Sequence, residues 1–135
     1  MFDPVTERRI KEFTEAAALH RFEASLLFGQ LTVYLAVFGA LLNAVIKNPP
    51  LDGRERVAIS LIGLAISLSF TVINERSVKH LRAAIRRAEY LGKELEMPLY
   101  AYRPVGGRIF TGLNAVRSLY AIGIITWIYI IAISA

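Results

Sequence analysis

Three long apolar runs without a charged side chain constrain this chain more than any other feature. They cover residues 25–46, 57–73 and 118–135. The first has 22 residues and, as a helix, spans roughly 33 Å, enough for a hydrocarbon core of about 30 Å. The second, with 17 residues, is at the short end of the range for a membrane span. Because backbone groups in lipid must be satisfied within the segment, and the runs lack the alternation of barrel strands, a helix is required.

The composition argues against several other classes of protein. Hydrophobic residues make up 55% of the 135 residues, above the roughly 45–50% usual in a soluble domain. A chain of this length has room for one domain. A soluble enzyme, a disordered tail and a disulfide-stapled secreted module are therefore disfavoured. The absence of cysteine excludes thiol catalysis, iron–sulfur clusters and thiolate zinc sites.

Helix breakers and capping residues define the connection between the first two runs. Pro49 and Pro50 cannot continue a helix, because they lack a backbone donor and restrict the residues before them. Asp52 and Glu55 resemble a capping box, which predicts that the second helix begins near Gly53. The first two spans therefore form a tight hairpin.

We predict a single domain over 1–135 that is all-α in class: an integral membrane helical bundle, with three transmembrane helices and long amphipathic cytoplasmic extensions. Its segments are an amphipathic helix over 4–24, a first transmembrane helix over 25–46, a second over 53–73, a cytoplasmic amphipathic helix over 74–96, an interfacial loop over 97–112 and a third transmembrane helix over 113–135.

The two amphipathic stretches each carry an apolar stripe. Apolar residues recur there at three- and four-residue spacing, and charged residues occupy the other faces. They include Ile10, Phe13 and Ala17 in the first stretch and Val78, Leu81 and Ile85 in the second. We expect the two stripes to pack together as a cytoplasmic stalk, either within one chain or between chains.

Lysine and arginine are distributed unevenly between the connecting segments. Residues 1–24 carry four and residues 74–117 carry nine, whereas residues 47–56 carry three. The positive-inside rule then predicts a multi-pass protein of the bacterial inner membrane, with a cytoplasmic N-terminus and a periplasmic C-terminus. The net charge of +5 is expected to attract anionic lipid headgroups on the cytoplasmic side. No nucleic-acid-binding motif accompanies it, so no nucleic-acid partner is expected.

The sequence offers no arrangement of residues suited to catalysis or metal binding. His20 and Glu23 supply two ligands on one helix face, but a metal site needs three or four. His80, the other histidine, lies on a polar face. The serines of the spans have no neighbouring histidine or lysine to act as a base. We therefore predict no enzyme, no cofactor and no metal site. Because the apolar runs contain no ionisable Asp, Glu, His, Lys or Arg, ion- or proton-coupled transport is also disfavoured.

Small and hydroxyl-bearing residues line one face of the second span. They recur at three- and four-residue spacing and are Ser60, Gly63, Ser67, Thr71 and Asn74. Such a face lets helices pack closely, with cross-helix hydrogen bonds of about 0.6 kcal/mol each. The alternative is a hydroxyl-lined pore, formed when several copies turn this face inward.

The first span carries a similar stripe of small residues. Its members are Gly29, Ala36, Ala40 and Asn43. We expect this stripe to allow close helix packing as well.

Residues 97–112 combine helix breakers with aromatic and basic side chains. An interfacial loop at headgroup level is the ordinary interpretation. The alternative is a site for a small anionic ligand or an anionic lipid, with Arg103, Arg108 and the amides of Gly106 and Gly107 as donors. The segment matches neither a P-loop nor a dinucleotide fingerprint.

The order of these segments resembles a known kind of protein. An amphipathic N-terminal helix, a two-span hairpin and the basic helix with residues 82–89 (RAAIRRAE) resemble the two-span effector (SLATT) families of bacterial conflict systems. The resemblance is one of architecture and covers residues 4 to about 96; the third span is a departure from it. It implies an effector that perforates or depolarises the membrane when activated, and it assigns no site residues.

We therefore expect a small non-enzymatic inner-membrane protein that self-assembles as a homo-oligomer, either into a pore or as a membrane-perturbing effector. Two alternatives stay open. The chain is an accessory or assembly subunit of a larger membrane protein partner, or it is a small-ligand or lipid-binding membrane module that uses residues 97–112.

The topology can be tested with reporter fusions. A reporter attached after Ala135 should be active in the periplasm, and one inserted within residues 97–104 should be active in the cytoplasm, because the basic segments resist translocation. A cytoplasmic signal from the C-terminal fusion would contradict the three-span topology.

Overall fold

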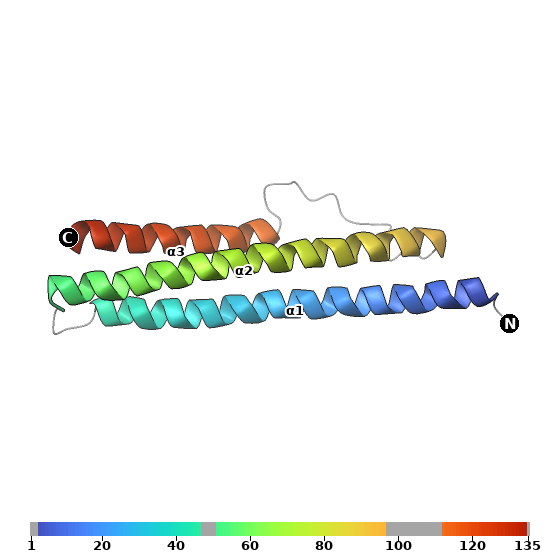
Figure 1. Ribbon diagram of the computed structural model, residues 1–135, viewed down its shortest axis with the longest axis horizontal. Helices are drawn as coiled ribbons and strands as arrows, with labels where there is room; N and C mark the ends of the chain where they lie inside the picture. Colours follow the sequence, from blue (N-terminus) through green and yellow to red (C-terminus); the bar gives the residue numbers. More distant parts are fainter. Residues whose placement is uncertain (1–2, 47–50, 97–111, 135) are drawn as a thin grey trace. The chain divides into compact units, whose positions relative to one another are not determined.

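A computed structural model describes residues 3–46, 51–96 and 112–134, and 96% of the described residues are helical. They form α1 (Pro4–Ile46), α2 (Gly53–Glu94) and α3 (Gly112–Ser134), with no strand among them (Figure 1). The predicted all-α class is confirmed. Each helix is long and apolar enough to cross a membrane. Of the predicted loop over 97–112, the described part contains only Gly112, which is the first residue of α3 rather than a loop residue.

The helix starts follow the capping residues. The N–H of Glu7 donates to the Asp3 carbonyl at 3.1 Å, closing the first turn of α1. At the start of α2, the carboxylate of Asp52 accepts the N–H of Gly53 at 2.7 Å, and its carbonyl accepts the N–H of Arg56 at 3.0 Å. Asp52 therefore satisfies backbone donors that a helix leaves unpaired in its first turn.

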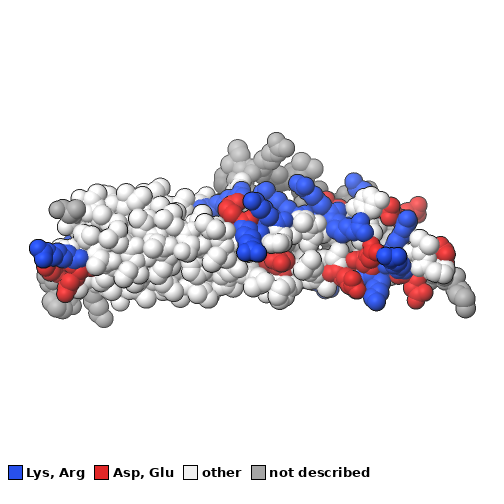
Figure 2. Space-filling view, in the orientation of Figure 1, with Lys and Arg blue, Asp and Glu red and all other residues white. Residues whose placement is uncertain are grey.

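The contacts divide the chain into two units. The charged unit comprises Met1–Phe28 and Arg76–Gly107, and the apolar unit comprises Gly29–Glu75 and Arg108–Ala135. Figure 2 shows most acidic and basic side chains over the charged unit, a wide uncharged surface over the apolar unit and a further charged group where α2 begins. The division follows the sequence, because it falls close to the points where the amphipathic stretches meet the apolar runs.

Within the charged unit, α1 and α2 run side by side (Figure 1). The stripe predicted on α2 is buried, with Val78, Leu81 and Ile85 all at most 9% exposed. On α1, Ala16 is buried within this unit, and its neighbour Ala17 is half-buried. The stripe predicted on α2 is thus buried, whereas Ile10, Phe13 and Ala17 of the stripe predicted on α1 are half-buried.

The apolar unit packs all three helices around large aromatic side chains. Trp127 of α3 is fully buried and forms a cluster with Val45 of α1 and Ile130 of α3. Its indole ring lies directly against Gly63 of α2, where an added Cβ would collide with the ring. Gly63 therefore acts as a notch that receives the indole.

Replacing Gly63 by alanine should destabilise the apolar unit. Alanine gains about 0.5–1 kcal/mol of helix stability over glycine, but its methyl would displace the indole, and overpacking costs about 1–3 kcal/mol. We expect a lower thermal midpoint in detergent. Because Trp127 is the only tryptophan of the chain, its emission should also shift to longer wavelength.

Gly39→Ala is the matched control, because no atom lies within 4 Å of a Cβ built at this position of α1. It should leave the midpoint and the emission unchanged or raise the midpoint slightly. Equal behaviour of the two variants would contradict the notch.

Candidate functional site

The small and hydroxyl-bearing residues predicted on the second span lie together on one face of α2. We call this set, Ser60, Gly63, Ser67, Thr71 and Asn74, the inner face. Thr71 is half-buried and the other four are buried, with both serines at 0% exposure and Asn74 at 1%. The structure thus places all five toward the interior of the apolar unit.

Tyr34 of α1 covers the middle of the inner face. Its hydroxyl lies 3.2 Å from the Ser67 hydroxyl, and both groups are buried. The same hydroxyl abuts Gly123 of α3, where an added Cβ would collide with it. The Tyr34 ring packs against Tyr120 of α3 and Phe70 of α2, with centroids 4.6 and 5.5 Å away. One side chain of α1 therefore contacts both other helices.

The hydroxyl groups of the inner face donate hydrogen bonds to the backbone of α2 itself. Ser60, Ser67 and Thr71 each donate to the carbonyl four residues earlier, at 2.8–2.9 Å. Since the single proton of Ser67 goes to its own helix, Tyr34 must be the donor of the bond between the two hydroxyls. This pattern satisfies polar groups that have no access to water.

This geometry bears on the two roles considered for the inner face. In the single chain it is filled by Tyr34 and Trp127, so it packs helices. A water-filled pore along it would require these aromatic side chains to leave the face and the three helices to separate.

Five buried polar atoms of the apolar unit have no hydrogen-bond partner among the described residues. Two of them, the Nε of Arg56 and the hydroxyl of Ser134, belong to half-buried residues. The other three are the amide oxygen of Asn74, the hydroxyl of Tyr120 and the indole N–H of Trp127. All three residues are at most 1% exposed. An unmade hydrogen bond of a buried group costs about 1–3 kcal/mol.

An ion pair joins α2 and α3 at one end of the apolar unit. The guanidinium of Arg117 donates to both carboxylate oxygens of Glu75, at 2.6 and 2.7 Å. This bidentate geometry is the strong form of the pair, although both side chains are more than a third exposed. The sequence analysis counted Arg117 only among the nine basic residues of 74–117. The available signal was position, because Glu75 follows the run 57–73 by two residues and Arg117 directly precedes the run 118–135, at the same predicted membrane boundary.

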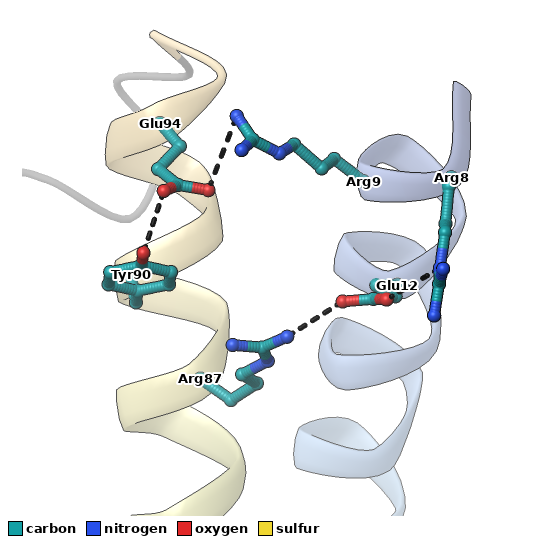
Figure 3. Close-up of polar contacts among 6 residues, drawn as sticks. All are labelled: Arg8, Arg9, Glu12, Arg87, Tyr90 and Glu94. Carbon is teal, nitrogen blue, oxygen red and sulfur yellow. Dashed lines mark hydrogen bonds and ion pairs between the residues drawn. The ribbon is translucent and has the colours of Figure 1, made fainter. Parts of the chain in front are cut away.

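A second group of polar residues lies in the charged unit (Figure 3). We call it the charged cluster: Arg8, Arg9 and Glu12 of α1, and Arg87, Tyr90 and Glu94 of α2. Sequence reasoning did not single it out, because its members belong to two helices more than 70 residues apart in the chain.

Two contacts of the charged cluster join α1 to α2, and two lie within a single helix. Arg87 donates to Glu12 at 2.7 Å, and Arg8 lies 3.4 Å from the other oxygen of that carboxylate. Arg9 lies 3.6 Å from one oxygen of Glu94, and Tyr90 donates to the other at 2.7 Å.

The contact with Glu94 changes the pKa of the Tyr90 hydroxyl. The hydrogen bond to Glu94, and then the negative charge of that carboxylate, raise the pKa of Tyr90 above its ordinary value. The Tyr90 hydroxyl therefore stays protonated through the physiological range. Arg87 lies over the Tyr90 ring, 5.7 Å from the centroid.

A cavity of about 250 Å³ opens beside the charged cluster. Its lining consists of the six residues of the cluster together with Val5 and Leu91. It is thus a small polar recess between two helices of one unit.

The remaining predicted positions give no site in the described part of the chain. Arg103, Gly106, Gly107 and Arg108 lie outside the described residues. His20 is half-buried on α1, and His80 is exposed on α2. Residues 3–46, 51–96 and 112–134 contain no group of three or more metal-ligating side chains placed to hold an ion.

No family model, curated protein or solved structure matches the chain. Its function is therefore inferred from the geometry of the inner face, the exposed faces of the helices and the charged cluster.

Two serines of α2 allow a matched test of the inner face. Ser67 and Ser69 each bond the carbonyl four residues earlier, but Ser67 is buried against Tyr34 and Ser69 is exposed. Ser67→Leu should lower the thermal midpoint, because the larger side chain displaces Tyr34 and overpacking costs about 1–3 kcal/mol. Ser69→Leu should leave the midpoint unchanged. Equal midpoints would show that the inner face is not packed against α1.

Proposed function

We propose that this chain is a non-enzymatic, multi-pass protein of the bacterial inner membrane that self-assembles through α1 and perturbs the membrane once assembled. Its N-terminus is cytoplasmic and its C-terminus periplasmic. The observation that carries the proposal is a small-residue face of α1 that the chain itself leaves uncovered.

The uncovered face of α1 consists of Gly29, Ala36, Ala40 and Asn43, and we call it the outer face. All four residues are exposed. At 100° per residue they lie on the side of α1 opposite Tyr34, which packs into the apolar unit. No atom lies within 4 Å of a Cβ built at Gly29. A second helix is therefore free to approach the α1 backbone closely along this face.

Asn43 supports a second copy of the chain as the occupant. An amide exposed to lipid benefits from a hydrogen-bond partner, because hydrocarbon supplies none. A carboxamide carries both a donor and an acceptor. It therefore pairs with its own symmetry mate across a two-fold axis, as a self-complementary interface requires. Small residues and polar amides are also the usual means by which helices associate in membranes.

The orientation and the activity are supported by the sequence. The 13 basic residues predicted on one side against three on the other favour a cytoplasmic N-terminus. The membrane-perturbing role is supported by the resemblance of residues 4 to about 96 to the two-span effector families. In this proposal the inner face holds each copy together, and the outer face joins one copy to the next.

Single cysteines test the assembly cleanly, because the chain has none of its own. Ala40→Cys should form a disulfide-linked homodimer when membranes are treated with a mild oxidant, since the two thiols would face each other. Ala121→Cys, at an exposed position of α3, is the matched control and should stay monomeric.

Three other outcomes would contradict the proposal. These are monomers from both variants, dimers from the control alone, or a cross-link of Ala40→Cys to a different protein. The last result would favour the accessory-subunit role.

A second measurement tests the activity. Expression of the wild type should depolarise bacterial membranes, as measured with a potential-sensitive dye. Ala36→Leu with Ala40→Leu should abolish depolarisation and cross-linking together, because the bulky side chains hold the helices apart. Depolarisation that persists without cross-linking would separate the activity from assembly and contradict the proposal.

A further inference from the structure

We propose that the charged cluster of α1 and α2 binds a small phosphate-bearing anion in the recess between the two helices. This inference is independent of the proposed function, because it concerns the charged unit alone.

The charge of the recess favours an anion. Three guanidinium groups line it against two carboxylates, leaving one positive charge in excess. Each carboxylate is already shared by two donors. Glu12 accepts from Arg87 and faces Arg8, and Glu94 accepts from Tyr90 and faces Arg9. The two carboxylates therefore leave N–H donors of the three arginines available.

Arg8 and Arg9 have the most donor capacity to spare. Their contacts with the carboxylates, at 3.4 and 3.6 Å, are longer than a charge-assisted hydrogen bond of about 2.7–2.9 Å. The side chain of Arg8 is 83% exposed and that of Arg9 is 46% exposed. Each guanidinium carries five N–H donors. Both are thus free to turn toward an anion without breaking a tight bond.

The form of the recess selects a small ligand with several acceptors. Its volume of about 250 Å³ is below the roughly 300–1,000 Å³ of sites for drug-sized molecules. The planar guanidinium of arginine can donate two parallel hydrogen bonds to two oxygens of one phosphate group. Donors come from both helices, with Arg8 and Arg9 on one side and Arg87 on the other (Figure 3). A phosphate group here would bridge α1 and α2 and stabilise the charged unit.

Binding of pyrophosphate and of inorganic phosphate to the full-length protein tests the inference. The protein is held in a neutral detergent, and binding is measured by calorimetry at constant ionic strength, with sodium chloride as the balancing salt. We expect saturable binding of at least one of the two anions. Arg9→Gln should weaken it by about tenfold or more, the effect of losing one charge-assisted hydrogen bond. Circular dichroism verifies that the variant keeps its helix content.

Arg82→Gln is the matched control. It removes the same charge from an exposed arginine of α2 outside the cluster, and affinity should stay within about twofold. Glu94→Gln should change affinity in the opposite direction. It removes a competing negative charge and frees Arg9, so binding should tighten, whereas Glu15→Gln, at an exposed position of α1, should not alter it.

Bilayers distinguish a soluble anion from a lipid headgroup. Pyrophosphate binding in bilayers of neutral phosphatidylcholine would identify a soluble ligand. Loss of that binding on addition of phosphatidylglycerol, seen equally in the wild type and in Arg82→Gln, would identify the lipid phosphate as occupant of the same site.

Two results would overturn the inference. One is the absence of phosphate and pyrophosphate binding above the chloride control in both detergent and bilayers. The other is an equal loss of affinity in Arg9→Gln and Arg82→Gln, which would show that binding depends only on the net charge of the protein.

Discussion

Close approach of three apolar helices depends on two glycines, Gly63 of α2 and Gly123 of α3. In lipid, helices gain little from hiding apolar surface, because the surrounding chains are equally apolar, so van der Waals contact has to supply much of the association. At each glycine a large aromatic side chain from a neighbouring helix reaches the backbone, Trp127 at Gly63 and Tyr34 at Gly123. The bulk of the aromatic rings is thereby accommodated without separating the helices.

The position of Tyr34 beside Gly123 also gives its hydroxyl a hydrogen-bond partner. Its hydroxyl fits beside Gly123 only because that residue lacks a Cβ, and in the same position it donates to Ser67. The serine accepts because its own proton is committed to the carbonyl of Gly63. One contact thus joins the three helices, and the choice of glycine on α3 and serine on α2 is explained by the same tyrosine of α1.

The sequence was sufficient to predict three helices long and apolar enough to cross a membrane, and to group the small and hydroxyl-bearing residues of α2 on one face. Spacing alone places Ser60, Ser67 and Asn74 together, because a helix brings every third or fourth residue onto one side. Spacing does not identify the partner. Nothing in the pattern shows that Tyr34 and Trp127 fill this face, since both belong to other helices and neither of their runs carries a charged residue that would distinguish its sides. The pairing of Arg117 with Glu75 was missed for the same reason, because 42 residues separate the two in the chain.

The polar groups of the apolar unit differ in how far their own helix can satisfy them. The short side chains of Ser60, Ser67 and Thr71 reach back to a carbonyl of α2. Asn74, Tyr120 and Trp127 each carry a buried polar atom that has no partner within residues 3–46, 51–96 and 112–134. Each such atom costs about 1–3 kcal/mol, and more where water is excluded. An arrangement of the helices that pairs any of them recovers that free energy. The apolar unit therefore combines tight contacts at its glycines with unpaired polar atoms that favour a rearrangement of the helices, as the assembly proposed for this chain would require.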